Sequence, residues 1–173
     1  MKNITTFLLS IFIISLFAGC AAASFTSYTP HEGNTYWMGA DGGKIVLTNN
    51  NSAKTPTYAQ LLVFLKADTT DQRKYTSKYT CGDFAETLHN NAEKKGYKTA
   101  WVSIQSINHA CNAFQTSDKG LVFIDCTGVP SGGKCYDTKV AVKTGTSYKR
   151  VPLFCSNVYF GSMGTVRSYK VYW

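Results

Sequence analysis

The chain has 173 residues, of which 44% are hydrophobic and 14% aromatic, and its formal net charge is +8 at pH 7. This size and composition fit one domain with its own hydrophobic core, and no internal repeat, low-complexity tract or second domain is visible. The basic residues are scattered and form no run, which predicts a soluble basic surface suited to anionic surroundings rather than a nucleic-acid interface.

Residues 1–23 have the pattern of a signal peptide. Lys2 gives a short basic start, and an apolar run follows from Phe7 to Phe17 before a stretch of small residues. The run is too short, and wrongly flanked, for an ordinary membrane-spanning helix. The sequence therefore predicts export from the cytoplasm.

Two modes of processing fit this leader. The stretch Leu16–Cys20 resembles a lipoprotein box, in which the leader ends at Gly19 and Cys20 carries the lipid. Ordinary cleavage near residues 22–23 would instead release the protein. We expect a protein that is either anchored to the outer face of the cell membrane or secreted.

The segment 24–36 is polar, contains a proline and a glycine, and is predicted to be a surface tether. A single domain then spans residues 37–173. Its first elements are a strand over residues 44–48 and a helix capped by Thr55, with Pro56 in the first helical position. The apolar stripe of this helix predicts packing against the next helix: Tyr58, Leu61, Leu62 and Leu65.

The next helix is predicted to begin at Cys81. Thr80 and Asp83 form a T-x-x-D capping box, which makes Thr80 the N-cap and puts Cys81 in the first helical position. Gly96 ends the helix. Because the free N–H groups at a helix start stabilise an anion, we expect Cys81 to be held as a reactive thiolate. The apolar face of the helix consists of Phe84, Ala85, Leu88 and Ala92.

A strand over residues 98–104 and a hairpin with strands at 109–114 and 121–126 follow. If the hairpin connection has an odd number of residues, His109 and Asp125 share one face of the sheet. An even number would place them on opposite faces. In the favourable register Asp125 binds one imidazole nitrogen of His109 and leaves the other free.

Cys81, His109 and Asp125 are thus the candidate catalytic residues. They would serve as nucleophile, general base and orienting acid, the three groups that covalent acyl transfer by a thiol requires. The backbone N–H of Cys81 would supply part of an oxyanion hole.

At Thr80–Ala85 (T-C-G-D-F-A) and His109–Asn112 (H-A-C-N) the chain resembles the transglutaminase-like (papain-like) cysteine enzyme superfamily, in particular small extracytoplasmic prokaryotic members. In that family a cysteine opens a helix, a histidine lies on a following strand and an aspartate on the strand after it. The resemblance spans roughly residues 55–142. It implies helices packed on an antiparallel sheet and amide chemistry: peptide or isopeptide hydrolysis, or transamidation, without a cofactor.

Three further residues are candidates for binding substrate or orienting the histidine. Asn108 and Asn112 flank it in sequence, and Trp101 fits a core position as well as a lid over the site. No side chain stands out as an oxyanion donor. Gln60 and Gln72 precede the nucleophile, but nothing in the sequence places either one.

Four cysteines remain once those assigned to lipidation and catalysis are set aside, and an even number outside the cytoplasm suggests disulfides. Cys126 and Cys135 bracket a turn-rich loop and are predicted to pair, which leaves Cys111 to pair with Cys155. A structural zinc site is less favoured, because no C-x-x-C or Cys–His spacing matches that of zinc ligands.

The last third of the chain is predicted to be strand-rich. Strands are expected over residues 140–142 and 148–154, with Pro152 implying an edge position or a bulge, and a closing strand over residues 166–173. The order of two helices followed by several strands predicts an α+β domain with an antiparallel sheet.

The expected function is that of an extracytoplasmic thiol enzyme acting on amide bonds of a peptide or protein, cell-envelope crosslinks included. The alternative is a non-catalytic cell-surface binding module of the same fold with a degenerate triad, in which a disulfide at Cys111 crowds His109. A polyanion-binding surface is the third option, since lysine and tyrosine interleave at 75–79 and 169–172. Nucleic acid is not an expected partner, membrane contact is expected only through lipid on Cys20, and the sequence does not set the oligomeric state.

Overall fold

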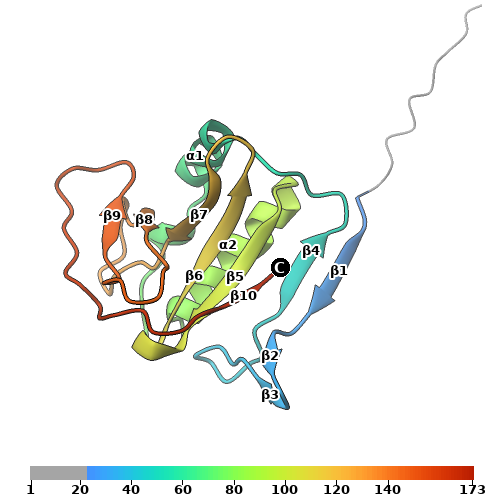
Figure 1. Cartoon of the computed structure of the whole chain (residues 1–173), viewed down its shortest axis with the longest axis horizontal. Helices are drawn as coiled ribbons and strands as arrows, with labels where there is room; N and C mark the ends of the chain where they lie inside the picture. Colours follow the sequence, from blue (N-terminus) through green and yellow to red (C-terminus); the bar gives the residue numbers. More distant parts are fainter. Residues whose placement is uncertain (1–22) are drawn as a thin grey trace, which may run out of the picture.

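The computed structural model describes residues 23–173, which form an α+β arrangement with two α-helices on one face of a six-stranded sheet (Figure 1). All strand pairs of the sheet are antiparallel, in the order β10-β5-β6-β7-β8-β9. The helices are α1 (Tyr58–Ala67) and α2 (Cys81–Lys95), and the short 3-10 helices are η1 (Thr70–Gln72) and η2 (Gln105–Ile107). The sheet consists of β5 (Thr99–Ile104), β6 (His109–Thr116), β7 (Gly120–Asp125), β8 (Thr138–Val140), β9 (Arg150–Pro152) and β10 (Lys170–Tyr172).

The sheet is buried on both faces because each face packs against a different part of the chain. Even-numbered residues of β6 and β7 contact α1 and α2, where they meet Leu61, Phe84 and Leu88 in one apolar cluster. Odd-numbered residues of β6 enter a second cluster with the C-terminal segment. The members of that second cluster include Ala100, Val102, Ile104, Cys111, Ala113, Val140, Val142, Tyr148 and Val166.

Helix α2 has the bounds predicted from its caps. The capping box between Thr80 and Asp83 is formed, and Gly96 adopts a left-handed conformation with φ 89° at the C-terminus. Helix α1 starts two residues later than the pair Thr55-Pro56 suggests. Thr57 is its N-cap. The Thr57 side chain accepts a hydrogen bond from the Gln60 backbone N–H, and the Gln60 side chain accepts one from the Thr57 backbone N–H. A helix starting at Thr55 would lack this capping box.

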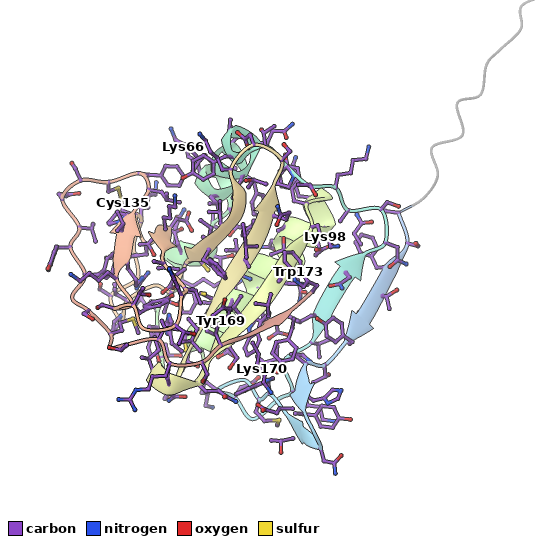
Figure 2. The ribbon with its side chains drawn as sticks, viewed as in Figure 1. Lys66, Lys98, Cys135, Tyr169, Lys170 and Trp173 are labelled. Atoms are coloured by element: carbon purple, nitrogen blue, oxygen red, sulfur yellow. A yellow bond between two sulfur atoms is a disulfide. The ribbon has the colours of Figure 1, made fainter. Side chains whose placement is uncertain are left out.

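The segment 24–36, expected to be a surface tether, is instead built into the fold. β1 (Phe25–Tyr28) pairs with β4 (Leu47–Asn50), and β2 (His31–Glu32) forms a hairpin with β3 (Thr35–Tyr36). Long-range polar contacts hold these strands against the end of the chain. Tyr28 donates to the carbonyl of Trp173, Trp37 donates to the Tyr172 hydroxyl, and Lys170 forms an ion pair with Glu32. Lys170 and Trp173 are labelled on the C-terminal segment in Figure 2.

The C-terminal strands lie close to their predicted places. β8 has the predicted three residues but lies two residues earlier, whereas β9 and β10 are shorter than predicted, with three residues each. Pro152 lies on β9 at one edge of the sheet. β10 pairs with β5 at the other edge. Within residues 23–173 no helix is both long and apolar enough to cross a bilayer. The predicted leader and Cys20 lie outside the described residues.

Candidate active site

Cys81 occupies the first position of α2, and its surroundings fix the start of that helix. Asp83 accepts a 2.7 Å hydrogen bond from the Thr80 backbone N–H and 3.2 Å bonds from that of Ala40. The thiol is free and partly exposed. A half-open sulfur at a capped helix start is suited to carry negative charge, because the N–H groups of the first turn point toward it.

His109 opens β6 and Asp125 closes β7. Thr116 and Gly120 form the last pair of the β6–β7 ladder. Three residues connect them, so the number of connecting residues is odd. The two side chains therefore share a face, and His109 Nε2 lies 2.7 Å from Asp125 Oδ2. The Asp125 carboxylate can only accept in this bond, so Nε2 carries the proton and Nδ1 is left for another partner.

Cys81, the third candidate catalytic residue, lies in the same cleft as the His109 ring. Interaction with Cys81 contributes to the raised pKa of His109. Burial is the largest single influence and opposes the charged ring, but the charge and hydrogen bond of Asp125, together with Cys81, outweigh it and raise the pKa of His109 to about 9. At neutral pH the ring is therefore an imidazolium bonded to the Asp125 carboxylate.

Asp125 is fully buried and is held by groups that the sequence did not reveal. Tyr148 donates a 2.9 Å hydrogen bond to Oδ2, Arg150 Nε lies 3.3 Å from the same oxygen, and the Thr127 backbone N–H donates to Oδ1 at 2.9 Å. Burial alone would raise the pKa of Asp125, but the positive charges of His109 and Arg150 and these hydrogen bonds hold it well below its usual range. The acid is ionised at every physiological pH.

A cleft of about 220 Å³ opens beside the thiol. Apart from Cys81 and His109, no residue lining it has an ionisable side chain, although the chain is strongly basic. Its walls come from the segment after β3, the start of α2, and the ends of β5 and β6. The lining residues are Trp37, Met38, Thr80, Cys81, Gly82, Trp101, Ser103, Gln105, Asn108, His109 and Ala110.

The three secondary candidates have different places. Trp101 is 3% exposed, donates its indole N–H to the carbonyl of Gly82 and forms part of the cleft wall, so it supports the helix start that carries Cys81. Asn108 lines the cleft in a left-handed conformation with φ 48°. Asn112 is not at the site. It faces α2 and donates to the carbonyls of Ala85 and Ala100, which ties the helix to the sheet.

Neither upstream glutamine reaches the cleft. Gln60 is used in the capping box of α1, and Gln72 lies in η1 beside a different cavity. Tyr75 is a candidate that sequence reasoning missed. Its ring stacks on Phe84, and burial, followed by the nearby charges of Cys81 and Asp83, raises the pKa of its phenol. A repeated tyrosine pattern before the helix was the only hint of it in the sequence.

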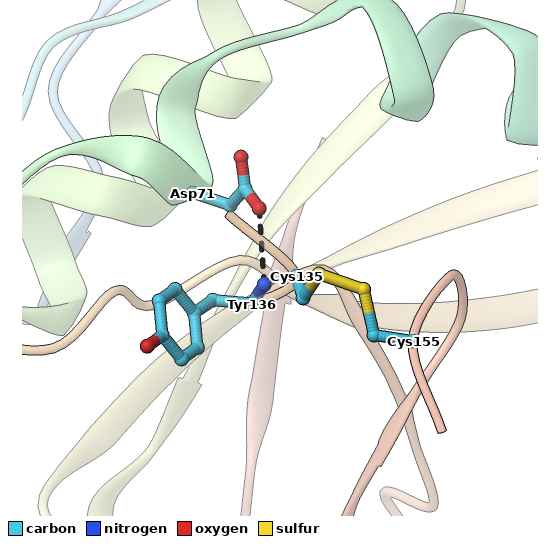
Figure 3. Close-up of a disulfide and its surroundings, with 4 residues drawn as sticks. All are labelled: Asp71, Cys135, Tyr136 and Cys155. Atoms are coloured by element: carbon cyan, nitrogen blue, oxygen red, sulfur yellow. Dashed lines mark hydrogen bonds between the residues drawn. A yellow bond between two sulfur atoms is a disulfide. The ribbon is translucent and has the colours of Figure 1, made fainter. Parts of the chain in front are cut away.

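The predicted disulfides are wrong. The bridge joins Cys135 to Cys155, with Cα atoms 5.6 Å apart, whereas Cys111 and Cys126 are free thiols (Figure 3). Cys126 faces the helices and donates to the carbonyl of Phe84, and Cys111 points to the opposite face of the sheet. Both sulfurs are enclosed by the core, so neither can reach a cysteine in a surface loop.

Among residues 23–173 no group of three or more His, Cys, Asp or Glu side chains is arranged to hold a metal ion. The site combines an anion-stabilising helix start, an imidazolium, a buried acid and a cleft whose other lining residues are not ionisable. Comparison with known proteins gives no assignment: no family model, no curated protein and no solved structure matches this chain.

Proposed function

We propose that this chain is an extracytoplasmic thiol enzyme that acts on amide bonds through Cys81, His109 and Asp125. The observation that carries the proposal is the position of the His109 ring, which is bonded to a buried carboxylate through one nitrogen and adjoins the sulfur of Cys81. Such an arrangement favours a thiolate–imidazolium pair at neutral pH. The α+β fold and the chain order of the three residues fit the transglutaminase-like superfamily that the sequence resembles.

The chemistry would proceed in two steps. The Cys81 thiolate forms a bond to the carbonyl carbon of an amide, and the C–N bond breaks as His109 gives its proton to the leaving amine. A water molecule or a second amine then attacks the acyl-enzyme and gives its proton to His109. The products are a carboxylic acid after hydrolysis or a new amide after transfer, and the thiolate is regenerated.

Two groups would donate to the oxyanion. The backbone N–H of Cys81 belongs to the unpaired amides of the first turn of α2. The second is the phenol of Tyr75, whose ring stacks on Phe84 near the start of α2, and no side chain among residues 23–173 is hydrogen-bonded to it. Tyr75 would therefore be the side-chain donor that neither glutamine can provide.

The substrate is proposed to be a peptide or protein, with cell-envelope crosslinks as one class. The Cys135–Cys155 bridge is compatible with a location outside the cytoplasm, where disulfides persist. Anchoring through lipid on Cys20 remains part of the proposal and is tested by mass spectrometry of the mature N-terminus. A lipid mass on Cys20 supports anchoring, and a free N-terminus at residues 22–24 contradicts it.

The test of the enzyme is the rate at which iodoacetamide alkylates Cys81 at pH 6. An ordinary thiol with a pKa of about 8.5 is largely protonated at this pH, so we expect Cys81 to react at least about tenfold faster in the folded chain than in the chain unfolded by urea. His109→Asn should abolish the difference. His31→Asn is the matched control, because His31 is exposed and, among residues 23–173, its ring forms a hydrogen bond only with the nearby Gly33 carbonyl.

A folded-state rate at or below the unfolded-state rate would contradict the enzyme. It would favour the binding module, for which the crowding disulfide at Cys111 can no longer be invoked because that thiol is free. Labelling should be located by peptide mapping, and Cys81→Ala should remove it.

A further inference from the structure

The inference concerns how Asp125 is held, and it rests on the proposed function. Asp125 Oδ2 receives three positively polarised groups, from His109, Tyr148 and Arg150, while Oδ1 is bonded to the backbone next to it. Only the last of these contacts is local in sequence. The two that compete with His109 for Oδ2 come from residues 148–150, more than twenty residues further along the chain.

Tyr148 touches both the acid and the base. Its side chain is fully buried, its hydroxyl is 2.9 Å from Asp125 Oδ2, and its ring meets the His109 ring edge-on with centroids 5.2 Å apart. Burial, followed by the charge of Asp125, raises the pKa of Tyr148 well above its ordinary value. The phenol therefore remains a donor throughout the pH range in which the site would work.

Arg150 supplies the compensating charge. It is 8% exposed, and its guanidinium also donates to the carbonyls of Thr127 and Tyr136 and to the Thr138 hydroxyl. A buried carboxylate without such a partner would bind the histidine proton very tightly. With Arg150 balancing Asp125, the imidazolium is left to balance the thiolate of Cys81.

Both groups lie inside the loop that the disulfide closes. Cys135 and Cys155 bracket β8 and β9, and the segment between them carries Tyr148 and Arg150. At the same end of the segment, the Tyr136 backbone N–H donates a 3.0 Å hydrogen bond to Asp71, next to the bridge (Figure 3). Strands of three residues at a sheet edge have few ladder bonds of their own, so the covalent closure is a main restraint on this segment.

We propose that the disulfide-closed segment 135–155 is a positioning unit for Asp125, and that Tyr148 is its positioning residue. The Tyr148 hydroxyl shares Oδ2 with His109 and thereby limits how tightly the carboxylate holds the histidine proton. The disulfide keeps the Tyr148 and Arg150 side chains within bonding distance of Asp125 Oδ2. A proton that must pass to a leaving amine is released more easily from a base tuned in this way.

The first experiment compares Tyr148→Phe with Tyr136→Phe by NMR titration of the His109 ring. Tyr148→Phe keeps the packed ring and removes only the hydroxyl, so Asp125 gains basicity and we expect the pKa of His109 to move upward by about 0.5 or more. Tyr136 lies in the same segment, and no side-chain hydrogen bond to its hydroxyl occurs among residues 23–173. Tyr136→Phe should therefore leave the pKa of His109 unchanged.

The second experiment tests the bridge with a double-mutant cycle. Replacing both Cys135 and Cys155 by serine should move the pKa of His109 in the same upward direction. Adding Tyr148→Phe to this variant should then change little, because the contact is already loosened. Fully additive shifts would contradict the role of the bridge. If the variant without the bridge does not fold, the comparison of the two tyrosine variants decides the role of Tyr148 by itself.

The outcomes separate this inference from the proposed function. An unchanged or lowered pKa of His109 in Tyr148→Phe, with Cys81 still rapidly alkylated, overturns the positioning role and leaves the enzyme intact. An upward shift with an unreactive Cys81 supports the positioning of Asp125 and contradicts the catalytic thiolate.

Discussion

His109 and Asp125 are joined by a 2.7 Å hydrogen bond between neighbouring strands, and their side chains are 4% and 0% exposed. Water therefore contributes little to the solvation of either group. The imidazolium depends on the carboxylate for its stability, and the carboxylate in turn depends on His109, Tyr148 and Arg150. A change at any of these residues should be felt by the others, which makes the group testable through stability as well as reactivity.

Asp125→Asn should both destabilise the protein and neutralise His109. Burial would then be opposed by Cys81 alone, so the pKa of His109 should fall well below 9. Arg150 would lose its buried counter-charge, and we expect the free energy of unfolding to drop by roughly 3–5 kcal/mol. Urea denaturation and NMR titration measure the two effects. Asp41→Asn is the control, since this exposed acid only accepts a local bond from Gly43.

If Asp125→Asn left the pKa of His109 near 9, the carboxylate could not be the cause of the raised value. If it cost less than about 1 kcal/mol, the buried charge network would have little weight in folding.

The raised pKa of His109 also makes stability depend on pH. The folded value of about 9 lies above the ordinary 6.5, so the folded state binds the proton more tightly than the unfolded state does. The stabilisation from His109 should be fully present below pH 6.5 and lost as pH rises through 9. We expect the difference in unfolding free energy between the native chain and His109→Gln to shrink over this window, measured by urea denaturation at several pH values.

His89 should act in a separate window. It is fully buried, and burial lowers its pKa to about 4, so stability linked to His89 is lost as pH falls from 6.5 toward 4. A difference curve for His109→Gln that is flat between pH 6.5 and 9, or that changes only on the acid side, would contradict the assignment.

Local patterns in the sequence predicted the parts of the site that are local in the structure. The capping box of Thr80 and Asp83 predicted the start of α2. The hairpin rule predicted that His109 and Asp125 share one face of the sheet if the connection between their strands has an odd number of residues, as it does. Tyr148 was beyond such reasoning. It reaches Asp125 from a segment whose placement depends on strand pairing and on a disulfide, neither of which leaves a periodic pattern in the sequence.

The two errors of placement have related causes. The segment 24–36 is mostly polar, so its pairing with β4 and its contacts with the chain end leave no hydrophobic alternation to find. The disulfide between Cys126 and Cys135 was inferred from the turn-rich loop between them. Cys126 directly follows β7, and the alternation of that strand continues to it and sends its side chain into the helix-facing core.

The free cysteines should differ sharply in accessibility. Cys81 is partly exposed, whereas Cys111 and Cys126 are 1% and 2% exposed, and burial raises the pKa of both buried thiols well above the ordinary value. In a chain beginning at Ser24, we expect Ellman's reagent to find one fast-reacting thiol per folded molecule and three after unfolding without reductant. Five thiols after unfolding would mean that the Cys135–Cys155 bridge is absent, and no fast thiol in the folded chain would mean that Cys81 is blocked.

Adding a single methyl group at Gly128 should lower the stability of the fold. This glycine follows Thr127, whose backbone binds Asp125, and a Cβ placed on Gly128 would lie 2.4 Å from the carbonyl oxygen of Arg73 and 3.0 Å from that of Asp71. Both obstacles are backbone atoms, which cannot swing aside as a flexible side chain does. We expect Gly128→Ala to lower the free energy of unfolding by roughly 1–3 kcal/mol or more.

Gly161→Ala is the matched control, because nothing lies within 4 Å of its added Cβ, and it should change stability by no more than about 0.5 kcal/mol. Thermal unfolding compares the two variants directly. Since displacing Gly128 also displaces the backbone donor to Asp125, the alkylation rate of Cys81 should fall in Gly128→Ala and stay unchanged in Gly161→Ala. Equal stability of the two variants would show that the loop after β7 is not packed against the segment before α2 as described, and that this segment does not help to hold the acid in place.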